Sequence, residues 1–137
     1  MRLTSFTDFG LRVLMRMASE PDRGFTAAEL ADEFRISRNH LAKVVSALSA
    51  GGYLETRRGG GGGAILARPP EAIRLGNVVA LLEAGQALVE CFLPGGNACT
   101  LTPHCLLKAR LAQAEAAFIA DLNRSTLADC VYRRATA

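Results

Sequence analysis

The chain has 137 residues, half of them apolar, which suits the core of a single domain with an arm. Its net charge of +3 arises within residues 1–70, which contain ten Lys and Arg and seven Asp and Glu. We therefore expect a polyanionic partner to bind there. No apolar run approaches the roughly 20 residues that cross a bilayer, and charged residues interrupt the N-terminal segment where a secretion signal would lie. We therefore expect a cytoplasmic protein with no membrane partner.

The first fifty residues predict three helices. Ser5 and Asp8 form a capping box at the start of the first helix, which runs from about residue 5 to 19. Thr26 opens a short second helix that ends at Phe34, and Ser37 caps a longer third helix. The inward faces of the first and third helices are apolar at helical spacing: Phe6, Phe9, Val13, Leu14 and Met17, then Leu41, Val44, Val45 and Leu48.

The second and third helices are separated by a three- or four-residue turn, which predicts a helix-turn-helix. In this motif the start of the second helix enters the major groove of DNA, where Arg reads guanine, Asn reads adenine and Lys neutralises phosphate. A solvated polar face is the alternative interpretation, but the polar cluster lies where a DNA-reading helix needs it. The predicted DNA-contacting residues of this helix are Ser37, Arg38, Asn39, His40 and Lys43.

Residues 53–56 and 64–67 predict a two-stranded β-hairpin directly after the third helix, which is the position of the wing in a winged helix. Arg57, Arg58 and Gly59 open the glycine-rich turn between the strands. Narrow minor grooves attract Arg, and glycine lets the backbone approach phosphate closely. A flexible linker is one alternative. A nucleotide-binding loop is another, but the Lys-Ser or Lys-Thr of such loops is absent from the sequence after Gly63.

The second half predicts a short helix from about residue 75 to 83, stopped by Gly85, and a long helix from Thr102 and Pro103 to about Asn123. The long helix carries an apolar seam that is too long for one small domain to cover, so pairing with a second copy is predicted, with ordinary core packing as the alternative. Ser125 or Thr126 caps a short last helix. The seam consists of Leu107, Leu111, Ala114, Phe118 and Leu122.

Three of the four cysteines, Cys91, Cys99 and Cys105, fall within fifteen residues of a Pro- and Gly-rich segment that opposes helix and strand. Thiolates bind zinc, copper(I) or iron-sulfur clusters, and three of them leave one position for another donor. The spacing differs from the Cys-x2-Cys of zinc ribbons. Burial as small apolar residues and disulfide formation are the alternatives, and disulfides are rare in the cytosol. Cys130 stands apart and is predicted to pack.

The sequence offers little for catalysis. It has two His, both already assigned to the third helix or the cysteine segment, no evident pair of acid and base residues, and no nucleotide motif. We therefore predict that the protein is not an enzyme.

The chain resembles the winged-helix iron-sulfur transcriptional regulators in long ungapped matches. These matches cover residues 3–12, 37–45 and 126–129, together with Arg58-Gly59 and Gly62-Gly63. The likeness is greatest to the branch of the nitric-oxide-sensing repressor NsrR. It implies a homodimer that crosses its long helices, two winged helices on a pseudo-palindromic promoter site, and an iron-sulfur cluster, with [4Fe-4S] favoured and [2Fe-2S] the alternative.

The same resemblance implies the ligands: Cys91, Cys99 and Cys105, with Asp8 of the other subunit as the fourth donor. His104, adjacent to Cys105, is an alternative donor. Lys108 occupies the position at which IscR-like members carry a ligand His, which argues against that branch.

These observations together predict a mainly α fold: a winged helix-turn-helix with a two-stranded β wing and a long C-terminal dimerisation helix. The expected parts are a DNA-binding domain at 1–70, a connecting helix at 71–90, a cluster-binding loop at 91–105, and a dimerisation helix with a C-terminal arm at 106–137. The predicted function is a repressor that leaves its promoter when nitric oxide attacks the cluster. An iron- or redox-sensing member of the same family and a metal-free thiol-disulfide switch are the alternatives.

Overall fold

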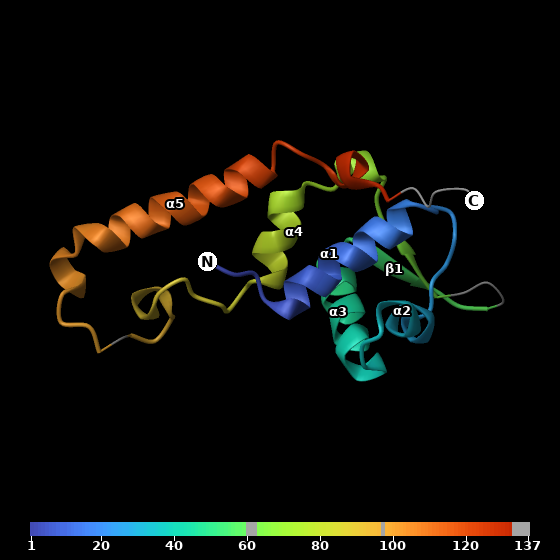
Figure 1. The fold of residues 1–137 in the computed structure, drawn as a ribbon, viewed down its shortest axis with the longest axis horizontal. Coiled ribbons are helices and arrows are strands. Elements are labelled where there is room, and N and C mark those ends of the chain that lie inside the picture. The colour runs from blue at the N-terminus through green and yellow to red at the C-terminus, as the bar shows by residue number, and fades with distance from the viewer. Residues whose placement is uncertain (60–62, 97, 133–137) are drawn as a thin grey trace.

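The computed structural model describes residues 1–59, 63–96 and 98–132 (Figure 1). Within them the chain forms five α-helices and one two-stranded sheet, in the order predicted for a winged helix with a long C-terminal helix. The main elements are α1 (Ser5–Ala18), α2 (Ala27–Phe34), α3 (Arg38–Ala50), β1 (Leu54–Arg57), β2 (Gly63–Leu66), α4 (Leu75–Leu82) and α5 (Leu106–Leu122). Three short 3-10 helices lie between these elements and a fourth follows α5: η1 (Pro70–Ala72), η2 (Glu90–Phe92), η3 (Thr102–His104) and η4 (Leu127–Cys130).

The core lies where α1, α2 and α3 meet the hairpin and α4. The predicted inward face of α3 is confirmed, because Leu41, Val44 and Leu48 are fully buried and Val45 packs against them. The core is not confined to residues 1–70, since side chains from the following segments belong to the same cluster: Ile73, Val78, Leu82 and Leu127. We call this unit, which comprises α1 to α4, the hairpin and η4, the winged-helix body.

Side-chain caps set the helix starts. The predicted caps of α2 and α3 are confirmed, since the Thr26 hydroxyl accepts from the Glu29 amide at 3.1 Å and the Ser37 hydroxyl accepts from the His40 amide at 3.0 Å. The predicted cap of α1 is wrong by one residue. Thr4 has extended backbone angles and accepts from the Thr7 amide at 3.2 Å, whereas Ser5 is already helical.

The turn between α2 and α3 is tight because Arg35 adopts the left-handed conformation, with φ 56° and ψ 45°. Its amide and that of Ile36 bond back to carbonyls in the last turn of α2. The chain therefore reverses in three residues, 35–37, and α3 crosses α2 as a helix-turn-helix requires.

The hairpin is antiparallel and pairs Leu54 with Leu66 through to Arg57 with Gly63, which confirms the predicted wing strands. Residues 60–62 of the predicted wing tip lie outside the described residues. A further bridge joins Phe25 to Ala64 through two backbone hydrogen bonds of 2.9 and 2.7 Å. The wing is thereby attached to the segment between α1 and α2 as well as to α3.

The long helix starts at Leu106 and not at Thr102 as predicted. Thr102 and Pro103 belong to the separate turn η3, and Cys105 then takes an extended conformation (φ −80°, ψ 107°) that interrupts the helix. α5 has no buried residue and projects from the body, with the cysteine segment beside its far end (Figure 1). Three large apolar side chains near this end are 64–83% exposed: Leu101, Leu106 and Leu107.

Within the described residues, none of the helices has the length and apolar character needed to cross a lipid bilayer.

Candidate nucleic-acid interface and cysteine loop

Four of the predicted reading residues lie exposed in one place, at the N-terminal end of α3: Ser37, Arg38, Asn39 and Lys43. The Arg38 guanidinium lies 3.7 Å from the Asp32 carboxylate on α2, with both side chains more than 70% exposed. An exposed ion pair of this kind contributes only about 0–1 kcal/mol. The guanidinium is therefore held loosely and can turn to another acceptor.

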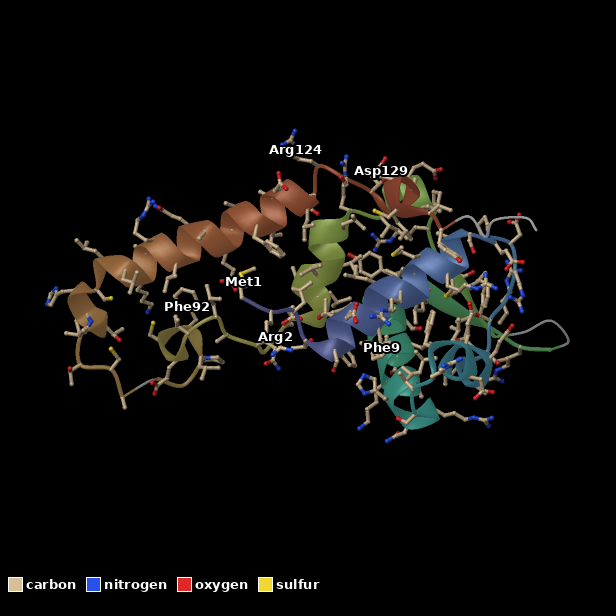
Figure 2. The ribbon with its side chains drawn as sticks, viewed as in Figure 1. Met1, Arg2, Phe9, Phe92, Arg124 and Asp129 are labelled. Atoms are coloured by element: carbon tan, nitrogen blue, oxygen red, sulfur yellow. The ribbon has the colours of Figure 1, made fainter. Side chains whose placement is uncertain are left out.

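His40 is placed differently from its predicted outward position. Its ring lies against Phe6 and Phe9 of α1, at centroid distances of 6.2 and 5.6 Å. The Nε2 atom is buried, and the described residues offer it no hydrogen-bond partner. Figure 2 shows Phe9 on the part of α1 that lies over α3. His40 thus joins the reading end of α3 to the first turns of α1.

The wing residues Arg57, Arg58 and Gly59 are exposed, and Gly59 has φ 102°. Gly63, at the turn end of β2, has φ 128°, and a Cβ there would lie 2.5 Å from the Phe25 carbonyl oxygen. Glycine is required at this position both for its conformation and for the close approach of the Phe25 backbone.

Two arginines make cation–π contacts with the Phe25 ring. Its fully buried ring lies between the guanidinium groups of Arg16 and Arg23, at 4.9 and 4.3 Å from the centroid. Arg16 also donates to Glu20 at 2.6 Å and to Glu33 at 2.9 Å. Burial alone would lower the pKa of Arg16, but these carboxylates raise it above its ordinary value, so the charge that braces α1 against α2 is permanent.

Residues 91–105, which we call the cysteine loop, carry three cysteines outside the core: Cys91 and Cys105 are partly exposed and Cys99 is exposed. Hydrogen bonds fold the loop on itself. The Glu90 carboxylate accepts from the Ala98 amide at 3.3 Å, which draws together the residues that precede Cys91 and Cys99. Backbone bonds then link Cys99 to Thr102 at 3.5 Å and Thr102 to Cys105 at 3.4 Å.

The thiol groups of the loop are suitable ligands for a soft metal centre, but the described residues of one chain do not bring enough of them together to form the site. No disulfide joins the cysteines, which all lie in described parts of the chain. Within those parts, however, no three His, Cys, Asp or Glu side chains come close enough to hold a metal ion. His104, the alternative donor, is exposed. Cys130 is partly exposed on η4 and lies outside the buried core.

Asp8, the predicted fourth ligand, lies on the first turns of α1 with its side chain 50% exposed. Both of its carboxylate oxygens accept from Arg12, at 2.7 and 3.2 Å. The same guanidinium lies 5.1 Å from the centroid of the Phe9 ring. In this conformation Asp8 is engaged within its own helix, through a pair that solvent weakens.

Sequence reasoning missed a partly buried cluster formed by Thr4, Thr7 and Glu83. One oxygen of the Glu83 carboxylate accepts from the Thr4 amide and hydroxyl, both at 2.8 Å, and from the Thr7 hydroxyl at 2.5 Å. Burial alone would raise the pKa of Glu83, but the hydrogen bonds from Thr7 and Thr4 lower it below its ordinary value. Nothing local could have signalled this cluster, because Glu83 lies 79 residues from Thr4.

A short hairpin after a helix-turn-helix, with an exposed polar row at the start of the second helix, defines a winged-helix DNA-binding regulator. A family model described as Rrf2, iron-dependent transcriptional regulator, matches residues 3–133. The chain therefore belongs to the Rrf2 family, and it is a transcriptional regulator and not an enzyme.

Solved structures share this fold. The global cysteine regulator CymR (YrzC) of B. subtilis is 22% identical with a TM-score of 0.71, covering 96% of each chain. T. potens IscR is 20% identical with a TM-score of 0.73, over 94% of this chain and 85% of that one. The oxidized form of Staphylococcus aureus CymR is 22% identical with a TM-score of 0.73, over 99% and 100%. These likenesses concern the fold, and the NsrR resemblance stays a prediction.

Proposed function

We propose that the chain is a promoter-binding repressor that acts as a homodimer. The observation that carries this proposal is that the winged-helix body presents both the exposed α3 row and the exposed wing arginines Arg57 and Arg58. In this arrangement Arg38 and Asn39 read base edges, Lys43 contacts phosphate, and the wing contacts the adjacent backbone or minor groove. The exposed apolar residues of α5 supply a surface for the second copy.

The DNA-binding proposal is tested by selecting duplexes from a random-sequence library with the full-length protein. We expect enrichment of an inverted repeat, because a two-fold symmetric dimer places its two reading helices on two related half-sites. Affinity for the selected duplex is then measured by fluorescence anisotropy at several salt concentrations. Sequence-independent binding alone would contradict base readout by α3.

We further propose that the cysteine loop is the sensor and holds an iron-sulfur cluster through Cys91, Cys99 and Cys105, with Asp8 of the partner subunit as the fourth donor. When bound, the cluster would supply iron, for which nitric oxide is a strong ligand. Asp8 is expected to be the weakest of the four ligands of the cluster iron, because a carboxylate is a harder ligand than a thiolate. Its present pairing with Arg12 is half-exposed, so leaving it costs only about 0–1 kcal/mol.

The sensor proposal is tested on protein purified without oxygen. Single changes of Cys91, Cys99 or Cys105 to Ala are each expected to give colourless protein, whereas Cys130→Ala keeps the visible absorption of wild type. Asp8→Ala is expected to keep part of the cluster and change its lability. Absorbance and Mössbauer spectra before and after nitric oxide identify the cluster and its reaction. Retained absorption in any loop variant would remove that cysteine from the site.

A metal-free thiol switch is the second candidate, and it is favoured by the absence of a three-donor group within the described residues of one chain. The Glu90–Ala98 hydrogen bond draws the segments of Cys91 and Cys99 together, so these two are the pair we expect to react. Two thiols and one hydrogen peroxide would give one disulfide and two waters. The solved oxidized CymR has the same fold.

Peptide mass mapping after peroxide treatment distinguishes the two candidates. The switch predicts a Cys91–Cys99 disulfide in iron-free protein together with changed DNA affinity. Iron and acid-labile sulfide in protein isolated without oxygen would exclude the metal-free switch.

A further inference from the structure

The Thr4–Thr7–Glu83 cluster joins the start of α1 to the end of α4 at a partly buried point. Thr7 is polar yet fully buried, and its hydroxyl hydrogen bonds to Glu83 at 2.5 Å. Glu83 is the C-terminal cap residue of α4, and Thr4 is the N-terminal cap residue of α1. One carboxylate oxygen therefore holds the end of one helix against the start of another through three charge-assisted hydrogen bonds.

On one side of this cluster the chain leads directly to the cysteine loop. Residues 84–88 follow Glu83 and line a cavity between α4 and α5, and each of them is exposed or partly exposed. No residue from 84 to 90 belongs to the buried core. The segment can therefore move with the loop, while Glu83 is the point at which it is fixed to the body.

On the other side, α1 leads to the reading helix. The first two turns of α1 carry Phe6 and Phe9, whose rings contact His40 at the start of α3. Because the buried imidazole Nε2 has no hydrogen-bond partner in the described residues, shape and aromatic contact position this ring. A shift of the first turns of α1 would thus move the support beneath Arg38, Asn39 and Lys43.

We propose that Glu83 is a positioning residue through which the cysteine loop controls the seating of the DNA-reading helix. The inference rests on the proposed function, and it names the contact that carries the signal. While Glu83 holds Thr4 and Thr7, α1 presses Phe6 and Phe9 on His40, and α3 is set for DNA. When the loop draws residues 84–90 away, the hydrogen bonds of Glu83 break and α3 loses this support.

The experiment compares full-length wild type with Glu83→Gln and Thr7→Val, which remove the charge and the donating hydroxyl with little change of shape. Two variants are controls: Thr7→Ser keeps the hydroxyl, and Glu71→Gln removes a carboxylate charge at an exposed site. Two quantities are measured: affinity for the duplex selected by wild type, and amide hydrogen exchange in residues 37–45 with residues 27–34 as the internal reference.

Glu83→Gln and Thr7→Val are expected to weaken DNA binding on the order of ten-fold, within the range of coupling between sites. Both are expected to speed exchange in 37–45 and leave 27–34 unchanged, whereas Thr7→Ser and Glu71→Gln behave like wild type. Unchanged affinity and exchange, or equal loosening of both segments, would overturn the proposal. If wild type selects no duplex, the repressor function fails, while the exchange pattern still decides whether Glu83 positions α3.

Discussion

Leu48 of α3 and Leu107 of α5 lie on predicted apolar helix faces of similar pattern, yet the first is fully buried and the second is 64% exposed. The winged-helix body buries its core with its own elements, whereas three large apolar side chains at the start of α5 and just before it are 64–83% exposed: Leu101, Leu106 and Leu107. The body therefore buries its core with this chain alone, while the exposed side chains near α5 are the surface at which we propose that a second copy packs.

The largest contrast is expected between Leu48→Ala and Leu107→Ala. Removing a fully buried leucine side chain costs about 2–5 kcal/mol of unfolding free energy, because transfer and cavity terms add. At a protein concentration low enough for monomers, Leu107→Ala should change it by less than about 0.5 kcal/mol. Urea unfolding followed by circular dichroism measures both. Equal losses would mean that α5 is packed within the monomer, and the comparison would fail.

The joint between the two regions is expected to be sensitive to Gly76→Ala. A Cβ at Gly76 would lie 2.3 Å from the Ile119 carbonyl oxygen and 2.6 Å from the Asn123 side-chain oxygen, so α4 and α5 would have to separate. Overpacking of this kind costs about 1–3 kcal/mol. Gly51→Ala is the control, since its closest conflict is with the flexible end of Leu81. Urea unfolding should show the larger loss for Gly76→Ala, and the reverse order would refute a rigid joint.

Within the body, Arg38→Ala and Lys43→Ala should separate base reading from phosphate binding. Arg38→Ala is expected to relax the preference at one base pair of the selected duplex by about 1–3 kcal/mol, whereas Lys43→Ala should weaken all sequences alike and reduce the salt slope by about 1. Anisotropy titrations on the selected duplex and on single-base variants measure both effects. Exchanged behaviour of the two variants would show that their assigned roles are reversed.

The smallest effect is the pH dependence that Glu83 contributes. Its folded-state pKa is lowered below its ordinary value of about 4.5, so its carboxylate stabilises the fold fully above that pH, and this contribution disappears as the pH falls through the folded-state pKa. The difference in unfolding free energy between wild type and Glu83→Gln should therefore be constant near neutral pH and shrink below about 4.5. Urea unfolding from pH 7 to 3 measures it, with Glu71→Gln as control. A difference that stays constant down to pH 3 would contradict the role of charge.

Local signals predicted most of the body correctly. Thr26 and Ser37 cap their helices as expected, because an N-cap depends on a side chain and an amide three residues away. The misplaced caps have the same local origin. Thr4 and Ser5 are both good cap residues, so the sequence alone does not distinguish them, and Thr102 with Pro103 forms a separate turn because Cys105 leaves the helical conformation.

Contacts between distant residues could not be predicted. The spacing of His40 on α3 does not show that Phe6 and Phe9 would draw its ring inward. Likewise, Glu83 finds its donors at the other end of the sequence. The cysteine loop presents a third limit, because the chain supplies the donor types but does not bring three of them together in its described residues.

The close contact between Gly76 and α5 also has a consequence for the operator. Asn77 and Asn123 exchange two hydrogen bonds of 2.9 Å beside it, so the angle of α5 to the body is set by backbone contact and a paired amide. In a dimer built on α5, this angle would fix the distance between the two reading heads. The spacing between half-sites that the dimer accepts would then be set by one glycine and two asparagines: Gly76, Asn77 and Asn123.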